Sequence, residues 1–349
     1  MKKKGLITLI VGMCLVLVIA MLPLMGACAK PAPPEVIELT LQTNMVTTHN
    51  RYETIVEPWA REIEERTNGR LKITLYPIGA IVKEPEMYDA LITGTIDIGH
   101  AGTYVSPGRF PLLDCVNIPG LGIQNDLTKS RTLWSIYNKF PEVQAEFKDV
   151  KLLWIFAMIS NMITSKTPIR TLADLKGMKI RAAPGPMFEA VERLGGVPVD
   201  VNWGDIYSSL EKGVIDGVAT QQQGAVPMRF YEVCPYCTWF DMGGVEFWQA
   251  MSLNAWNSLP NDIQKVFEEL SGDHGVELTG MQEVKYEEWG WNFTQEQGTE
   301  VIELPPEDQA KAMELLAPIP AKWAADMDAK GLPGTEILEE VKKLYAASK

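Results

Sequence analysis

The sequence predicts an α/β fold in which two similar halves face each other across a cleft. Beyond the first thirty residues, segments with strand periodicity and segments with helix periodicity alternate along the chain. The pattern Tyr-x-x-Leu-x-x-Gly-x-Ile-Asp occurs at 88–97 and again at 207–216. Each copy is typical of a helix end, a glycine in the left-handed conformation and a strand. Chance similarity of two such units is the alternative to a true repeat.

The first half begins with alternating strands and helices. The predicted elements are strands at 38–42, 71–76 and 96–100, and helices at 51–67 and 84–93. This order predicts a largely parallel sheet that is covered on both faces. Ligands of such sheets bind beyond the carboxyl ends of the strands. We therefore expect residues 99–104, and their counterparts 218–223 in the second half, to face the cleft.

The last third of the chain is predicted to be mainly helical. A helix begins near Asn261 and runs, with breaks, toward the tryptophan-rich stretch 287–293. A strand at 300–304 and two helices, at 307–330 and 334–347, complete the chain.

The pattern of residues 1–30 predicts an export segment, which is not part of the predicted fold. Three lysines precede an apolar run at 6–24, and the run leads to Met25-Gly26-Ala27-Cys28. This tetrapeptide resembles a lipobox, which predicts acylation of Cys28; an uncleaved membrane anchor is the alternative. The following proline-rich residues, 31–35, predict a stiff linker. Both alternatives place the rest of the chain outside the cytoplasm.

The net charge of the chain limits its partners. The formal charge is −13 at pH 7. An acidic surface disfavours nucleic acid and anionic lipid surfaces, so we expect no nucleic-acid partner. If such a protein binds an anion, it needs a local site with a well-placed cation.

One such cation is Arg181, at the carboxyl end of a predicted strand. A capped turn that begins at Thr171 leads through Gly177 into this strand, and the Pro/Gly loop 182–186 follows. The planar guanidinium holds a carboxylate through two parallel hydrogen bonds, which a lysine cannot do. The alternative is a surface arginine that closes a strand.

Cys234 and Cys237 form a Cys-x-x-Cys motif, which raises the possibility of thiol–disulfide exchange. A redox motif of this kind opens a helix, whose N-terminus lowers the thiol pKa. Here the neighbouring residues are aromatic and β-branched and indicate a strand or strand edge. In an extended strand the two Cα atoms lie about 10 Å apart, beyond the reach of a disulfide. A structural turn disulfide or two free thiols are the favoured interpretations.

The sequence contains no constellation typical of an enzyme. Its three histidines are far apart and form no metal-binding pattern, and the nucleophile-elbow, phosphate-loop and dinucleotide-binding motifs are missing. This favours a binding protein over an enzyme, with no cofactor and no metal.

Several segments, in this order and spacing, resemble the extracytoplasmic substrate-binding proteins of TRAP (tripartite ATP-independent periplasmic) transporters, a family that includes dicarboxylate-binding proteins. The resemblance covers essentially the whole chain beyond the export segment. The matching segments are 71–77, 90–97, 172–181, 206–217, 230–233 and 255–260.

The resemblance implies a two-domain periplasmic-binding-protein fold of the Venus-flytrap type. Each domain is a mainly parallel sheet flanked by helices, and the ligand cleft lies between them. The expected boundaries are 36–158 plus 247–287 for domain I, and 159–246 plus 288–349 for domain II. Such a receptor binds a small carboxylate and delivers it to membrane permease subunits driven by an ion gradient. The binding protein of an ABC importer is the alternative.

The resemblance also assigns site residues. Arg181 falls on the carboxylate-binding arginine of the family, and Trp203 on an aromatic residue of the pocket. Asn161 and Thr220 replace an arginine and an asparagine of the sugar-acid binders, which favours a smaller or more apolar acid. Further candidate contacts are aromatic side chains or polar groups near the strand ends: Tyr104, Phe188, Asn44, Gly102, Thr103 and Gln221.

Overall fold

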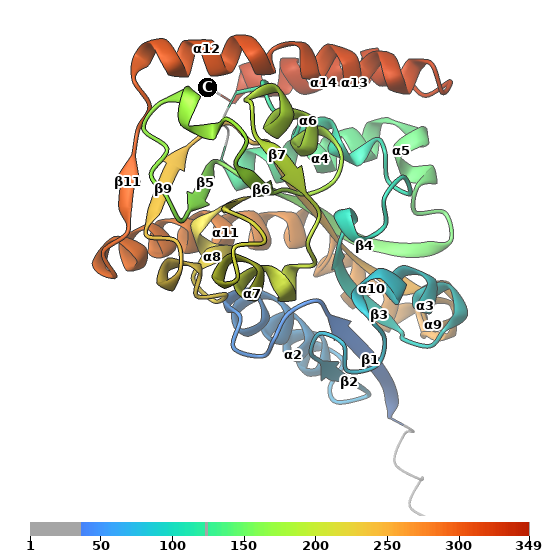
Figure 1. The fold of residues 1–349 in the computed structure, drawn as a ribbon. Coiled ribbons are helices and arrows are strands. Elements are labelled where there is room, and N and C mark those ends of the chain that lie inside the picture. The colour runs from blue at the N-terminus through green and yellow to red at the C-terminus, as the bar shows by residue number, and fades with distance from the viewer. Residues whose placement is uncertain (1–35, 123–124, 349) are drawn as a thin grey trace, which may run out of the picture. The chain divides into compact units, whose positions relative to one another are not determined.

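The structure, a computed structural model, describes residues 36–122 and 125–348. Residues 38–349 form one compact unit, and the following account concerns it. This unit contains a five-stranded and a six-stranded sheet with helices packed around them (Figure 1). The predicted export segment, the acylation site Cys28 and the linker at 31–35 lie outside the described residues.

The five-stranded sheet has the order β2-β1-β3-β10-β4. Its strands are β1 (Ile37–Thr43), β2 (Leu71–Tyr76), β3 (Ile98–Gly102), β4 (Val150–Ile159) and β10 (Gly244–Ser252). β1 and β3 are parallel, whereas β10 is antiparallel to both β3 and β4. The helices of this part are α2 (Glu57–Arg66), α3 (Met87–Thr93), α4 (Asp126–Lys139), α5 (Pro141–Ala145), α9 (Leu253–Ser258) and α10 (Asn261–Glu269). The predicted elements of the first half are therefore present.

The six-stranded sheet has the order β11-β9-β5-β8-β6-β7. Its strands are β5 (Met162–Ser165), β6 (Lys179–Arg181), β7 (Val197–Val199), β8 (Gly217–Thr220), β9 (Tyr236–Trp239) and β11 (Glu300–Ile302). The helices nearby in sequence are α6 (Pro186–Arg193), α7 (Ile206–Glu211) and α8 (Gln222–Ala225). β6 is parallel to β7 and β8, and β5 is antiparallel to β8 and β9.

The two repeated segments adopt the same local structure. Gly94 follows α3 with φ of 73°, and Gly213 follows α7 with φ of 72°, before β3 and β8 respectively. Only glycine takes this left-handed conformation without strain, which explains its place in both copies. The α/β fold with two sheets is confirmed, and the repeat corresponds to equivalent places in them.

Both sheets contain more antiparallel strand pairs than the mainly parallel sheets that we expected. Two chain segments, between β4 and β5 and between β9 and β10, cross from one sheet to the other and bring antiparallel strands with them. These connections are hydrogen-bonded to each other: the Ser160 amide donates to the Gly243 carbonyl (2.9 Å), and the Met242 amide donates to the Ser160 carbonyl (3.1 Å).

The helical stretch expected from Asn261, with breaks, to 293 is present as two helices: α10 and, after a break at 270–271, α11. α11 (Gly272–Glu296) has 25 residues and packs against α4 and β4 beside the five-stranded sheet and against α8 beside the six-stranded sheet. At 1.5 Å per residue it is about 37 Å long. The predicted helix at 307–330 is instead two helices, α12 (Pro306–Leu316) and α13 (Pro318–Asp328), because Pro318 begins a new helix; α14 (Gly334–Ala347) follows.

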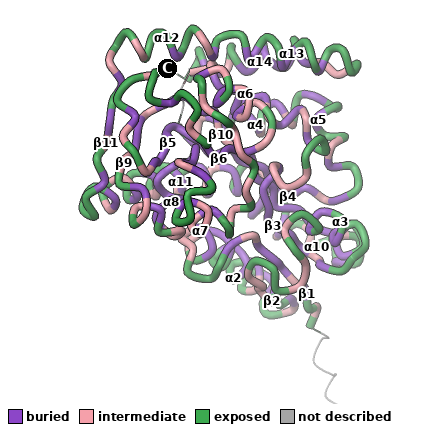
Figure 2. The backbone as a smooth tube through the Cα atoms, viewed as in Figure 1, coloured by how far each residue is buried: buried purple, intermediate pink, exposed green. Residues whose placement is uncertain are grey.

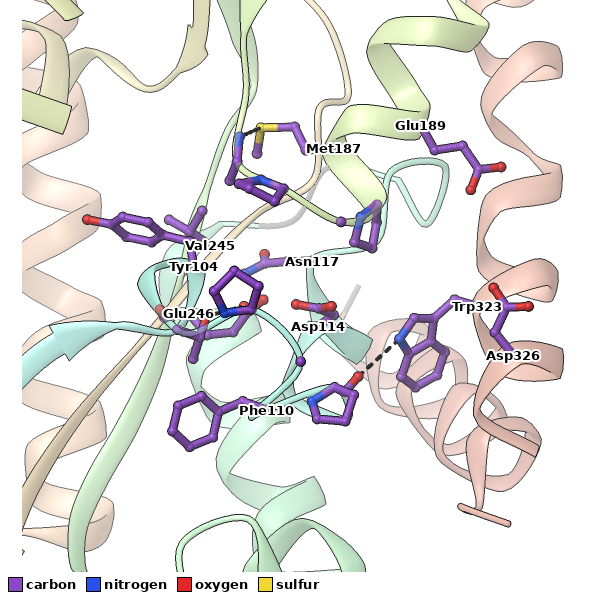
Figure 3. A pocket seen from close by; sticks show the side chains of 18 of the residues that line it. Tyr104, Phe110, Asp114, Asn117, Met187, Glu189, Val245, Glu246, Trp323 and Asp326 are labelled. Carbon is purple, nitrogen blue, oxygen red and sulfur yellow. Dashed lines mark hydrogen bonds between the residues drawn. The ribbon is translucent and has the colours of Figure 1, made fainter. Parts of the chain in front are cut away.

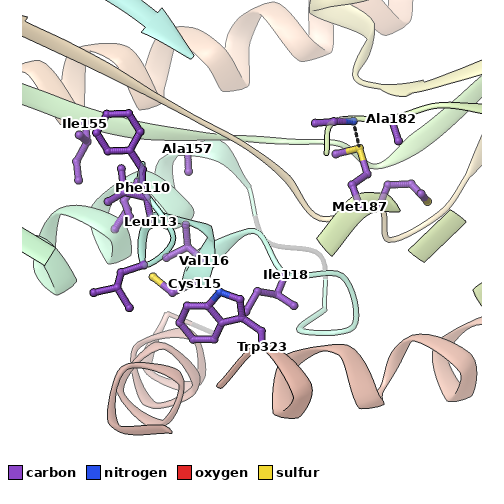
Figure 4. Close-up of a cluster of buried hydrophobic side chains, with 14 of the residues drawn as sticks. Phe110, Leu113, Cys115, Val116, Ile118, Ile155, Ala157, Ala182, Met187 and Trp323 are labelled. Atoms are coloured by element: carbon purple, nitrogen blue, oxygen red, sulfur yellow. Dashed lines mark hydrogen bonds between the residues drawn. The ribbon is translucent and has the colours of Figure 1, made fainter. Parts of the chain in front are cut away.

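The core lies in the central strands and the helices that cover them. Figure 2 shows buried residues along the strands and exposed residues on the outer faces of the helices. One cluster of buried side chains extends from Ile155 and Ala157 of β4 through Leu113 and Val116 to Trp323 of α13 (Figure 4). α13 is thus fixed by apolar packing on residues that lie some 200 positions earlier.

Candidate functional site

A small cavity lies where the strand ends of the two sheets meet, and it brings together six of the ten sequence-predicted ligand contacts. These are Arg181, Trp203, Thr220, Gln221, Tyr104 and Asn44. Its free volume is about 60 Å³. We call it the arginine cavity.

The positions of these residues follow from the topology. Arg181 and Thr220 are the last residues of β6 and β8, which are neighbouring parallel strands. In the five-stranded sheet, Asn44 directly follows β1. Tyr104 lies two residues beyond β3, which is the parallel neighbour of β1. Because parallel strands end at the same edge, each sheet contributes its carboxyl edge to the cavity.

Arg181 is a buried cation without an ion-pair partner among the described residues. Only 5% of its surface is exposed, and its Nε donates to the Val201 carbonyl at 3.2 Å. Its Cζ lies 5.5 Å from the centre of the Trp203 ring. Burial lowers the pKa of Arg181, while Tyr104, Asp200 and Glu84 act in the opposite direction without hydrogen-bonding to it. A buried guanidinium in this state is stabilised by an anion that reaches its terminal nitrogens.

Glu84 organises the side of the arginine cavity that belongs to the five-stranded sheet. Its Oε1 accepts hydrogen bonds from Asn44 Nδ2 (2.8 Å) and from the Tyr104 hydroxyl (3.1 Å). Burial raises the pKa of Glu84, and the two hydrogen bonds oppose that rise. Asn44 and Tyr104 are therefore held in place by a carboxyl group that sequence reasoning did not identify.

Arg51 and His49 also line the arginine cavity, and sequence reasoning missed both. Arg51 was expected only as part of an amphipathic helix. Its Nε donates to Glu283 of α11 at 2.6 Å, and its Cζ lies 4.6 Å from the centre of the Phe247 ring. The partner is 232 residues away in sequence, so no local pattern reveals that Arg51 is buried.

Two neutral histidines accompany Arg51. Burial, followed by the charge of Arg51, lowers the pKa of both His49 and His100 to about 3. Each histidine binds a proton near pH 6.5 in the unfolded chain. The unfolded state therefore takes up protons first as the pH falls below 6.5, and the free energy of unfolding decreases toward pH 3.

We expect replacement of His100 by glutamine to reduce this acid sensitivity. His100 is fully buried and shares a 3.0 Å hydrogen bond with Gln249. Urea unfolding at pH 7 and pH 5 measures the effect: the wild type loses more stability between the two pH values than His100→Gln. Equal losses contradict the assignment of a buried neutral imidazole.

Four predicted contacts lie elsewhere. Thr103 lines a neighbouring cavity and donates to Glu246 Oε2 at 3.1 Å. Asn161 lies in the connection between β4 and β5, and Phe188 packs from α6 against the core. Gly102 acts indirectly: a Cβ there lies 2.1 Å from the Tyr104 ring, so glycine allows that ring to fold back over the strand end.

The neighbouring cavity is larger, about 390 Å³, but its lining contains no arginine. Asp114 and Glu246 face it, together with Asn117 (Figure 3). Burial raises the pKa of Asp114 to about 7. Lys322, at its edge, is already paired with Asp326 at 2.8 Å. The arginine cavity is therefore the candidate site for an anion.

The cysteines provide a test of the redox alternative. Cys234 and Cys237 are free and buried, as is Cys115, and Cys237 lies in β9 as the flanking residues indicated. Burial raises the pKa of Cys234 to about 12, which opposes formation of the reactive thiolate.

We expect the native protein to resist alkylation of its cysteines and the urea-unfolded protein to incorporate three labels beyond the export segment. Rapid labelling of native Cys234 contradicts this.

The two-sheet architecture and a cavity between strand ends define the class of two-domain solute receptors. Residues 42–326 match the DctP family, described as bacterial extracellular solute-binding protein, family 7, and the chain belongs to this family. The family's description as extracellular solute-binding proteins agrees with the expectation of a binding protein rather than an enzyme, and with the expected location outside the cytoplasm. Among residues 36–122 and 125–348, no helix has both the length and the apolarity to cross a membrane.

Three relatives illustrate the similarity. A monocarboxylate 2-oxoacid-binding periplasmic protein of Nostoc sp. is 30% identical over 60% of this chain and 59% of its own length, so the match spans less than two thirds of that relative. A TRAP periplasmic solute-binding protein of Desulfovibrio salexigens superposes with a TM-score of 0.77 at 29% identity, over 88% of this chain and 95% of that one. One from Bordetella bronchiseptica, solved with mandelate, gives 0.82 at 25% identity over 90% and 100%. The TRAP resemblance is confirmed.

Proposed function

We propose that the chain is an extracytoplasmic receptor that binds a small organic acid in the arginine cavity and delivers it to a TRAP-type permease driven by an ion gradient. The observation that carries this proposal is Arg181: a buried guanidinium at the meeting point of two sheet edges, with no ion-pair partner in the part of the chain that the structure describes. A carboxylate there supplies both the charge and the two acceptors that the guanidinium needs.

The ligands of relatives support an acid. The Nostoc protein is named for 2-oxoacids, and the Bordetella structure contains mandelate, a hydroxy acid. Both are monocarboxylates. The lining of the larger cavity also supports Arg181 as the anchor, since it contains no arginine that could hold a carboxylate through two hydrogen bonds.

Trp203, Thr220 and Gln221 are proposed contacts from the six-stranded side, and Tyr104 and Asn44 from the five-stranded side. The proposed domains are 36–158 plus 247–287 and 159–246 plus 288–349, which assign nearly all of each sheet to one domain. A ligand that contacts both domains binds the closed state preferentially and shifts the equilibrium toward it. We further propose that the exported chain is held at the outer face of the cytoplasmic membrane through a lipid on Cys28.

A thermal-shift screen of the chain from about Pro33 tests the function. Small carboxylic acids are compared with their neutral amides. A ligand present at 1,000 times its Kd stabilises the fold by about 4 kcal/mol, which gives a clear rise in melting temperature. Acids that stabilise while amides do not support the proposal, and stabilisation by amides or amines alone contradicts it. An ATPase gene beside the receptor gene, in place of two permease genes, favours the ABC importer.

A further inference from the structure

Two buried carboxyl groups lie where α11 passes from one sheet to the other. Glu283 and Glu287 are one turn apart on the same face of this helix, and 0% and 7% of their surfaces are exposed. Carboxylates at this spacing repel each other. Burial of both therefore requires that each has its own hydrogen-bond donors, and these donors come from different parts of the fold.

Glu287 holds the short helix α8. Its Oε1 accepts the amide hydrogen of Gln222 (3.2 Å), and its Oε2 accepts that of Gln223 (3.0 Å). Gly290, one turn further along α11, allows close packing, because a Cβ there would lie 2.8 Å from the backbone of Gln222. α8 therefore rests directly on this part of α11. Gln221, immediately before α8, lines the arginine cavity.

Glu283 has one oxygen on each side of the crossing. Its Oε1 accepts a hydrogen bond from Nε of Arg51 at 2.6 Å, and its Oε2 accepts one from the side-chain amide of Gln223. Arg51 lines the arginine cavity from the side of the five-stranded sheet. In the proposed domains Arg51 and Glu283 belong to domain I and Gln223 to domain II. The bond from Gln223 to Glu283 therefore joins the two domains.

The bond lies outside the cavity but is connected to it. Neither Glu283 nor Gln223 lines the arginine cavity, and only 2% of Gln223 is exposed. The next residue, Gly224, does line it, and a Cβ there would lie 3.3 Å from the ring of Trp203. The centre of that ring is 5.5 Å from Cζ of Arg181. The position of α8 thus determines where Trp203 meets Arg181.

We propose that Glu283 is a positioning residue whose carboxylate stabilises the closed arrangement of the two walls of the arginine cavity. This role rests on the proposed function, in which the two domains close on the ligand. Arg51 of one wall and Gln223 of α8 are held by the same carboxylate group. When the domains separate, the bond from Gln223 breaks, whereas the ion pair with Arg51 stays within domain I.

The expected contribution of this bond to closure follows from its chemistry. Hydrogen bonds to an ionised carboxylate are among the stronger ones in proteins, and a buried carboxylate oxygen that loses its donor is costly. A bond present only in the closed state shifts the equilibrium toward that state. Since the closed state must open before the ligand leaves, the bond is expected to slow dissociation.

Gln223→Met tests the role of the bond. Methionine has nearly the length of glutamine but no donor, and the ion pair of Arg51 with Glu283 keeps the charges of the cavity unchanged. We expect the Kd of an acid from the thermal-shift screen to rise about fivefold or more, the scale of one charge-assisted hydrogen bond. The rise is expected in the dissociation rate, with less than about a twofold change in the association rate.

Stopped-flow fluorescence measures both rates, because Trp203 lines the cavity. Two acids of different affinity are compared, and the same factor is expected for both, since the bond does not touch the ligand. A side chain that contacts the ligand would change the two by different factors. Loss of packing alone would lower the melting temperature without this selective change in the dissociation rate.

Gln295→Met is the matched control. Gln295 is an exposed residue near the end of α11, and its replacement is expected to leave both rates within about twofold of wild type. If Gln223→Met does not fold, Gln223→Asn is measured instead. Asparagine keeps the amide but is one carbon shorter, and it is expected to raise the dissociation rate about threefold or more because the bond to Glu283 is lost.

The outcomes separate the positioning role from the proposed function. An unchanged dissociation rate, a change in the association rate alone, or different factors for the two acids overturns the role of Glu283 and leaves the acid receptor standing. An equal effect in Gln295→Met also overturns it, as does failure of both Gln223 variants to fold, which would assign the bond to folding. If no carboxylic acid binds the wild type, the proposed function fails and the positioning role fails with it.

Discussion

Replacement of Arg181 by alanine is expected to weaken binding of the carboxylate ligand by about 2–5 kcal/mol, the range for breaking a buried charge pair. The reason is that the ligand carboxylate then remains buried without a cation. The ligand-free protein is expected to be at least as stable as wild type, because the substitution removes a buried charge that has no ion-pair partner among the described residues. Isothermal titration and urea unfolding measure the two effects.

Arg170→Ala is the matched control for this experiment. Arg170 is an exposed arginine of the same part of the chain and pairs with Glu300 at 2.6 Å. Its loss is expected to change ligand affinity by less than twofold, because the pair is solvated and lies outside the lining of the arginine cavity. Unchanged affinity in Arg181→Ala contradicts the assigned carboxylate anchor.

Replacement of Lys129 by methionine is expected to destabilise the fold by about 3–5 kcal/mol, the scale for a buried charge network that loses one partner. Lys129 is 2% exposed and donates to Asn117 Oδ1 (3.0 Å) and to the Gly243 carbonyl (3.1 Å) in the connection between the sheets. Its ammonium lies near the buried carboxyl groups of Asp126, Asp241 and Glu246. Without it, these groups share the site with no cation.

Urea unfolding at pH 7 measures this loss. Lys139→Met, in the last turn of the same helix α4, is the control, since Lys139 makes an exposed ion pair with Glu340 at 2.8 Å. The control is expected to lose less than about 1 kcal/mol. A similar loss in both variants contradicts a structural role for the buried network.

The sequence predicted the site residues whose positions follow from where each strand ends. Arg181, Thr220 and Tyr104 lie at or just after strand ends, and parallel strands place such residues at one edge. The repeated helix–glycine–strand unit likewise pointed to two sheets, because Gly94 and Gly213 are required at equivalent places.

The rest of the site depends on long-range packing that leaves no local pattern. Arg51 resembles a solvated residue of an amphipathic helix until Glu283 of α11 is placed against it. Glu84 follows a turn and gains its role only through Asn44 and Tyr104. The helical stretch beyond Asn261 was predicted with breaks, but the position of the break between α10 and α11 was not.

The most direct test of the central claim is a crystal structure of the protein with an acid identified in the thermal-shift screen. The account predicts that the ligand carboxylate lies in the arginine cavity, with its two oxygens within 3.2 Å of the terminal nitrogens of Arg181, in the usual range of hydrogen bonds. A ligand in the larger cavity beside Asp114 and Glu246, or a carboxylate with no contact to Arg181, contradicts it.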